Sequence, residues 1–345
     1  MTGLAVMQAP LSIIDDSEWQ PAELVGTRDL SPTIRELTLR FEGRMERRRP
    51  CPAGSHLRIA IDVDGREDFR SYSVVAQDGD RLRIAVKRQP VSRGGSAFMC
   101  SLQPGATIRV AGPHCDFPLT LGAPEYLLIA GGVGITPMMT IAAVLAGRGD
   151  RVRLVYGARS ADEFAYREEL ETMLGERLHC VDADRGEQID ITAEIAALGA
   201  DAQLYMCGPL GLMEAVRVAW QAAGRVPTRL RYETFGSSGR FQAQPFTVKV
   251  PRLGVEVAVA ANQSMLDALE QAGVEVVFEC RRGECGLCAI DVLDVDGEID
   301  HRDVFLSDRQ HRDGKRLCAC VSRIAGTSVT IDPAWRGDGA FAMAS

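Results

Sequence analysis

The sequence lacks the features of a membrane protein or a nucleic-acid-binding protein. Its 345 residues contain no run of about eighteen apolar residues, so we expect no membrane span. The formal charge of −8 argues against nucleic acid as a partner, because phosphate contacts need a basic face. The N-terminal stretch has no basic segment followed by a long apolar one, so no secretory signal is predicted. We therefore expect a cytoplasmic protein.

Groups for acid–base catalysis are also scarce. None of the five histidines has a metal-type spacing or an adjacent nucleophile, and His301 is expected in a surface turn. Cysteine, by contrast, is plentiful, with ten residues of which half lie between positions 280 and 320. In a long chain without a secretory signal, such clustering favours metal ligands over disulfides. The length and the 46% hydrophobic content are typical of two or three soluble domains.

The strongest motif is the stretch CRRGECGLC. Its cysteines, Cys280, Cys285 and Cys288, have the C-x4-C-x2-C spacing of plant-type ferredoxin ligands to a 2Fe–2S cluster. The two glycines of this stretch allow the backbone angles that wrapping a cluster requires. A zinc site is the alternative, but zinc sites more often pair two C-x2-C units. Cys318 and Cys320 are both at a plausible distance to supply the fourth ligand.

Hydrophobic patterning divides the chain into three predicted domains. Residues 22–121, after an extension over 1–21, contain short β-type runs separated by Gly, Pro and Asp, which predict an antiparallel β-barrel. Residues 122–236 alternate strand and helix patterns, which predict an α/β domain with a parallel sheet. A polar linker is expected at 237–244. Residues 245–345 are expected to form an α+β domain of the β-grasp, ferredoxin-like type, with a C-terminal tail.

The last domain has two further features. Ser264 and Asp267 predict a capping-box start to a helix that Gly273 ends. Between residues 245 and 345, acidic side chains outnumber basic ones by 16 to 11. A negative docking face toward a basic partner is therefore predicted.

Two loops of the α/β region suit a dinucleotide. GGVGITP at 131–137 follows an apolar strand and opens a helix, the geometry that holds a pyrophosphate. It is not a G-x-G-x-x-G fingerprint, so a plain strand-to-helix turn is the alternative. Cys207, Gly208 and Pro209 end a later parallel strand, where open α/β sheets bind ligands. Taken alone, this cysteine is more often simply buried before a turn.

The barrel region offers groups for an anionic, planar cofactor. Arg70, Tyr72 and Ser73 supply a cation, a ring and a hydroxyl, although such a strand segment taken alone is more often structural. Lys87 and the loop 92–96 add a cation and backbone donors suited to a phosphate.

These motifs occur together in an order that resembles the phthalate dioxygenase reductase family, within the ferredoxin-reductase superfamily. Vanillate O-demethylase reductase subunits are similar. The motifs are R-x-Y-S in the barrel, GGVGITP, CGP, Glu233 with Phe235, CRRGECGLC and CVSR. The resemblance covers about residues 22–332, and the joint occurrence is far more specific than any single motif. It implies a flavin-binding barrel, a nicotinamide domain and a ferredoxin domain in one chain.

The resemblance also implies roles for individual residues. Arg70, Tyr72 and Ser73 would hold the flavin ring and chain, with Arg93, Gly95 and Ser96 near its phosphate. Thr136 and Cys207 would lie beside the nicotinamide and Phe235 against the flavin ring, and these three are the predicted catalytic residues. The cysteine of CVSR would supply the last iron ligand, which selects Cys280, Cys285, Cys288 and Cys320. The remaining predicted cofactor-binding residues are Lys87, Gly131, Gly132, Gly134, Pro137, Arg159, Asp162, Gly208, Pro209 and Glu233.

The resemblance implies FMN, and the sequence has no clear extra segment for the adenosine half of FAD. NADH is the implied donor, although Arg159 would suit the 2′-phosphate of NADPH as Asp162 would suit a ribose hydroxyl. The resulting hypothesis is a reductase that passes electrons from NADH through FMN and the cluster to a separate Rieske-type oxygenase. Alternatives are a reductase for a haem monooxygenase, a redox sensor without turnover, and a zinc-stabilised binding module on a degenerate reductase.

Overall fold

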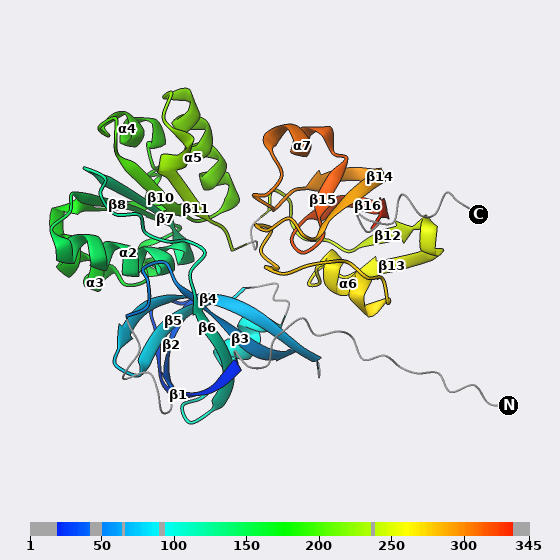
Figure 1. The fold of residues 1–345 in the computed structure, drawn as a ribbon, viewed down its shortest axis with the longest axis horizontal. Coiled ribbons are helices and arrows are strands. Elements are labelled where there is room, and N and C mark those ends of the chain that lie inside the picture. The colour runs from blue at the N-terminus through cyan, green and yellow to red at the C-terminus, as the bar shows by residue number, and fades with distance from the viewer. Residues whose placement is uncertain (1–18, 42–49, 64–65, 90–93, 236–238, 334–345) are drawn as a thin grey trace.

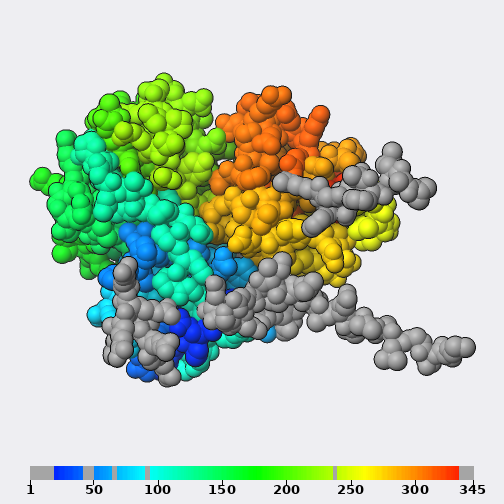
Figure 2. Space-filling model, in the orientation of Figure 1, coloured from blue at the N-terminus to red at the C-terminus, as the bar shows by residue number. Residues whose placement is uncertain are grey.

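The computed structural model describes residues 19–41, 50–63, 66–89, 94–235 and 239–333. Within them, three sheets form three domains that pack against one another (Figures 1 and 2). Arg93, most of the predicted N-terminal extension, the start of the predicted linker and the C-terminal tail lie outside the described residues. The three-part architecture predicted from the sequence is confirmed.

The first domain is a closed six-stranded antiparallel barrel. Its strands, in the order β1-β2-β5-β4-β3-β6, are β1 (Trp19–Asp29), β2 (Ile34–Phe41), β3 (His56–Val63), β4 (Arg66–Asp78), β5 (Arg81–Lys87) and β6 (Thr107–His114), and helix α1 (Gly95–Ser101) lies between β5 and β6. The apolar residues of β2 alternate only partly, because both of its faces are covered. Leu37 and Leu39 point into the barrel core, whereas Ile34 packs with residues of the second domain.

The second domain has a five-stranded parallel sheet in the order β11-β10-β7-β8-β9. Its elements are β7 (Tyr126–Gly131), α2 (Ile135–Arg148), β8 (Val152–Ala158), α3 (Arg167–Leu174), β9 (Leu178–Asp182), α4 (Ile191–Ala196), β10 (Gln203–Cys207), α5 (Leu210–Ala222) and β11 (Leu230–Glu233). Two separate apolar clusters cover the sheet. One includes α2 and α3 and the other α4 and α5, so helices lie on both faces as predicted.

The third domain has a mixed sheet in the order β13-β12-β16-β14-β15. Its elements are β12 (Phe246–Val250), β13 (Val255–Val259), α6 (Met265–Gln271), β14 (Ala289–Asp300), α7 (Asp308–Asp313), β15 (Arg316–Cys318) and β16 (Arg323–Asp332). The predicted capping box is present, because Ser264 and Asp267 exchange side-chain to backbone hydrogen bonds. Gly273, just beyond the helix, adopts a φ of 75°.

The barrel and the parallel sheet share a continuous apolar contact. Val75, Ala85 and Phe117 of the barrel pack in the same cluster as the α2 residues Ile135 and Met138. The barrel is thereby fixed against the helix that follows the glycine-rich loop. No helix in the described ranges has the length and apolar character needed to cross a membrane.

Candidate functional site

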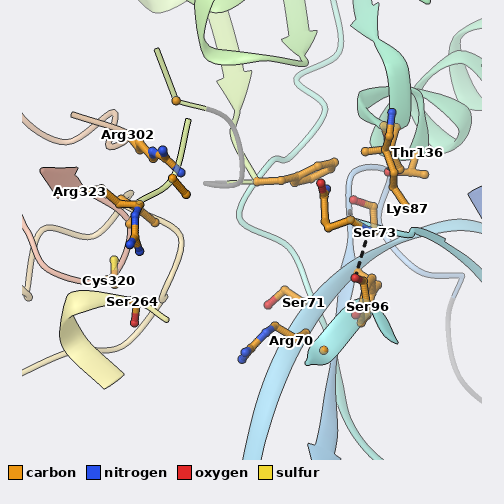
Figure 3. A pocket seen from close by; sticks show the side chains of 18 of the residues that line it. Arg70, Ser71, Ser73, Lys87, Ser96, Thr136, Ser264, Arg302, Cys320 and Arg323 are labelled. Carbon is orange, nitrogen blue, oxygen red and sulfur yellow. Dashed lines mark hydrogen bonds between the residues drawn. The ribbon is translucent and has the colours of Figure 1, made fainter. Parts of the chain in front are cut away.

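A cavity of about 410 Å³ lies where the three domains meet (Figure 3). Its volume is within the usual range for cofactor and ligand pockets. The barrel contributes Arg70, Ser71, Tyr72, Ser73, Lys87, Gly95 and Ser96, the second domain Val133, Thr136 and Phe235, and the third domain Ser264, Arg302, Cys320 and Arg323, among other residues. Residues predicted from separate motifs to bind the flavin, the nicotinamide and the cluster therefore line the same cavity.

The barrel side of the cavity is built from neighbouring strands. Arg70, Tyr72 and Ser73 lie on β4, and Lys87 ends β5 beside it. Ser96 lies in the first turn of α1, and its hydroxyl oxygen accepts the Gln89 N–H at 3.2 Å. Cationic side chains, hydroxyls and one aromatic ring thus face the same space. This set of groups fits a flavin mononucleotide, which has a planar ring, a polar chain and a phosphate.

Cationic side chains also line the opposite side of the cavity. Arg302 and Arg323 come from the third domain and face the barrel residues across the space (Figure 3). Arg302 is held by the carboxylate of Asp300 at 2.6 Å, and Arg323 donates to the carbonyl oxygens of Gln244 and Ala260 at 2.9 Å. Sequence reasoning missed both arginines, because their position depends on how two distant domains meet.

The nicotinamide side lies at the carboxyl edge of the parallel sheet. The glycine-rich loop follows β7 and leads into α2, and Cys207 ends β10, the strand next to β7. A Cβ added to Gly134 would lie 2.2 Å from the carbonyl oxygen of Cys207, so only glycine permits this approach. The strand order reverses between β7 and β10, because β8 and β9 lie on one side of β7 and β10 lies on the other. Open α/β sheets bind nucleotides at this switch point.

Two buried ionisable side chains, Cys207 and Glu233, lie at this edge of the sheet. Cys207 is fully buried, and burial raises the pKa of its thiol well above the ordinary value. Glu233 ends β11 next to Cys207, and burial raises the pKa of its carboxyl to about 8. The Arg282 guanidinium, 3.2 Å from Glu233, opposes that rise. Burial therefore raises the pKa of Glu233 by more than the ion pair with Arg282 lowers it.

The predicted nucleotide-end residues lie apart from the cavity. Arg159 and Asp162 are exposed just beyond β8, and Asp162 accepts a hydrogen bond of 2.5 Å from the Ser160 hydroxyl. The guanidinium predicted to suit a 2′-phosphate and the carboxylate predicted to suit a ribose hydroxyl thus both lie at this edge of the sheet. At the same edge, Gly131 ends β7, Gly132 follows it, Pro137 lies in the first turn of α2, and Gly208 and Pro209 follow β10.

The cysteine loop leads into β14. The Sγ atom of Cys280 accepts the N–H groups of Arg282, Glu284 and Cys285 at 3.4, 3.5 and 3.4 Å. Such donors stabilise negative charge on a ligand sulfur and raise the reduction potential of a cluster. At Gly286, φ is 73°, and an added Cβ would lie 2.2 Å from the Phe305 ring. The loop geometry therefore requires glycine at this position.

All five cysteines of the third domain lie close together. A hydrogen bond from the Cys320 thiol is the largest cause that lowers the pKa of Cys280, to about 4. Hydrogen bonds from Cys318 and Cys320 lower the pKa of Cys288, also to about 4. The Cys320 thiol thus interacts with both Cys280 and Cys288, and the Cys318 thiol hydrogen bonds with Cys288. This arrangement fits thiolates converging on one compact cluster.

The position of His301 differs from the sequence expectation. Its side chain is only 11% exposed, and its ring stacks on that of His311 with centroids 4.3 Å apart. Both rings face Asp303, whose buried carboxylate also accepts the Leu306 N–H at 2.8 Å. The surface-turn prediction was wrong because the ring of His311, from α7, stacks on His301 and covers it.

Known proteins resemble each domain of the chain. The family model of an oxidoreductase FAD-binding domain matches residues 21–118. The model of an oxidoreductase NAD-binding domain matches residues 128–218, and the model of a 2Fe-2S iron-sulfur cluster binding domain matches residues 248–325. The heme-dependent oxidative N-demethylase beta subunit of Ectopseudomonas mendocina is 35% identical, over 88% of this chain and 96% of that protein.

Phthalate dioxygenase reductase of Burkholderia cepacia is 33% identical, over 82% of this chain and 88% of that protein. A solved phthalate dioxygenase reductase structure, described as modular for electron transfer from pyridine nucleotides to [2Fe-2S], superposes with a TM-score of 0.72. It is 29% identical and covers 92% of this chain and 98% of that one.

Proposed function

Because the chain belongs to the phthalate dioxygenase reductase family, we propose that it is the reductase component of a multicomponent oxygenase. It is an oxidoreductase with flavin-binding, NAD-binding and 2Fe–2S domains. The proposed donor is NADH, the proposed flavin is FMN, and the electrons leave for a separate terminal oxygenase. The observation that carries this proposal is the single cavity lined by Tyr72, Thr136 and Cys320, each from a different domain.

When bound, the flavin would take two electrons as hydride and release them singly, which matches a one-electron cluster to a two-electron donor. The chain contributes binding and orientation. Arg70, Lys87 and Ser96 would bind the flavin's polar parts on the barrel side. The Gly134–Cys207 contact would keep the sheet edge close enough for the nicotinamide to reach the ring. We infer that Cys320 is the fourth iron ligand, together with Cys280, Cys285 and Cys288.

The cofactors can be tested on the purified protein. We expect about two irons and two sulfides per chain, and we expect the released flavin to be FMN. NADH should sustain turnover with an artificial acceptor. A protein without iron would contradict the cluster, a colourless third domain that holds zinc would favour the binding-module alternative, and negligible turnover would favour the redox sensor.

The relatives point to two classes of terminal acceptor for the electrons. The family resemblance favours a Rieske-type oxygenase, whereas the N-demethylase relative favours a haem-dependent acceptor. The acidic excess of residues 245–345 predicts attraction to a basic docking face in either case. Electron transfer to the cognate oxygenase should weaken with added salt, and a transfer rate indifferent to salt would exclude this docking mode.

A further inference from the structure

An arginine of the cysteine loop joins all three domains. The guanidinium of Arg282 lies 2.8 Å from Asp116 of the barrel domain and 3.2 Å from Glu233 of the second domain. It also lies 3.0 Å from Glu284 in its own loop, and Glu284 in turn accepts the N–H of Thr234 at 3.3 Å. The Arg282 side chain is only 11% exposed. One guanidinium thus contacts carboxyl groups from all three domains, of which Glu233 and Glu284 are largely buried and Asp116 is 54% exposed.

We propose that Arg282 is a positioning residue for electron transfer, which holds the cysteine loop against the flavin and nicotinamide domains. This inference rests on the proposed function. Arg282 lies between the loop cysteines Cys280 and Cys285, and its backbone N–H donates to the sulfur of Cys280. One residue thus contacts both other domains through its side chain and the sulfur of Cys280 through its backbone.

Electrostatics explains why the contact depends on an arginine. Arg282 donates to the carboxyl groups of Glu233 and Asp116 and pairs with Glu284, and Glu233 is almost fully buried. Removing the guanidinium would leave buried carboxyl oxygens without their hydrogen-bond donor, which weakens the contact between the domains. The forked guanidinium reaches Glu233 through Nη1 and Asp116 through Nη2. A lysine ammonium is a point charge and cannot make both contacts with the same geometry.

Two other ion pairs connect the second domain to the third domain and to the linker. Arg217 pairs with Asp308 at 2.9 Å and Arg240 with Glu214 at 3.1 Å, and these side chains are 30–63% exposed. Exposed pairs contribute little, because water screens them. Arg217 therefore provides a matched control, since its replacement removes an interdomain charge pair away from the cysteine loop.

The test compares Arg282→Ala, Arg282→Lys, Asp116→Asn and Arg217→Gln in the full chain with flavin and iron bound. Each variant is mixed rapidly with NADH without oxygen, and flavin and cluster absorbance are followed separately. We expect cluster reduction in Arg282→Ala to slow by roughly tenfold or more, because the rate depends steeply on how closely the two redox centres are held. Lysine should restore part of the rate, Asp116→Asn should show a smaller loss, and Arg217→Gln should match the wild type.

Two further readouts separate positioning from general damage. The cluster's electron paramagnetic resonance spectrum and the rate of flavin reduction should change far less than the rate of cluster reduction. Wild-type cluster reduction in iron-loaded Arg282→Ala would overturn the inference. If Arg282→Ala does not retain iron, Arg282→Lys and Asp116→Asn decide, and wild-type rates in both would overturn it. A wild-type cluster that NADH never reduces would instead overturn the proposed function.

Discussion

Cys318 and Cys320 are separated by one residue, yet their thiols have different neighbours. Cys318 ends β15, pairs with Ala289 through the sheet and reaches Cys288. Cys320 follows the strand, reaches both Cys280 and Cys288, and lines the interdomain cavity. A fourth ligand must approach the sulfurs of the other three, so the geometry supports Cys320.

The choice between these cysteines predicts different effects of two matched variants. Cys320→Ser should lose the cluster, because serine removes a thiolate that reaches two other ligands. Cys318→Ser should keep it and lose at most some stability in the buried strand. Iron and sulfide per chain, with the visible spectrum, give the measurement. Cluster loss in Cys318→Ser with retention in Cys320→Ser would transfer the ligand role to Cys318.

The start of α2 is fixed by a backbone contact that a single methyl group would break. Gly134→Ala would place a Cβ 2.2 Å from the Cys207 carbonyl oxygen, whereas a Cβ at Gly147, later in the same helix, meets nothing within 4 Å. We expect Gly134→Ala to cost roughly 1–3 kcal/mol of unfolding free energy and to weaken NADH binding. Gly147→Ala should be neutral or stabilising by up to about 1 kcal/mol. Thermal unfolding and NADH titration of both variants provide the test. Equal stability and equal NADH affinity in the two variants would contradict a structural role for the Gly134–Cys207 contact.

The segment from β14 to α7 is held by one buried carboxylate. Burial alone would raise the pKa of Asp303, but the approach of His301 and the hydrogen bonds from His311 and the Leu306 N–H leave that pKa well below its usual range. A lowered pKa means that the folded state favours the ionised form. The contribution of Asp303 to stability is therefore complete above the usual aspartate range, and it is lost as the pH falls through the lower folded value.

Replacing this carboxylate should therefore change how stability depends on pH. Asp303→Asn should lower stability at neutral pH by roughly 1–3 kcal/mol, because buried donors lose their acceptor. The difference from the wild type should shrink in acid. Asp313→Asn, which removes an exposed partner 3.7 Å from Arg309, is the control and should have little effect. Unfolding curves recorded between acidic and neutral pH give the measurement. The same pH dependence of stability in both variants would contradict the role of Asp303.

The sequence predicted the domain types because their signals are local. Strand and helix periods, the capping box at Ser264 and the cysteine spacing each depend on residues close together in the chain. The contacts between domains have no such signal. Arg282 and Asp116 are 166 positions apart, and nothing in the letters R-R between two cysteines indicates which carboxylates they meet. The same holds for Arg302 and Arg323, which face the barrel residues only after the domains assemble.

The assembled molecule places groups from three domains around one cavity, and the proposed function predicts that electrons pass through it in a fixed order. Rapid mixing of the flavin- and iron-loaded protein with NADH, without oxygen, tests that order most directly. Flavin absorbance should fall first and cluster absorbance second, at a rate independent of protein concentration because both centres lie in one chain. A cluster that stays oxidised after the flavin is reduced, or that is reduced only between molecules, would contradict the account.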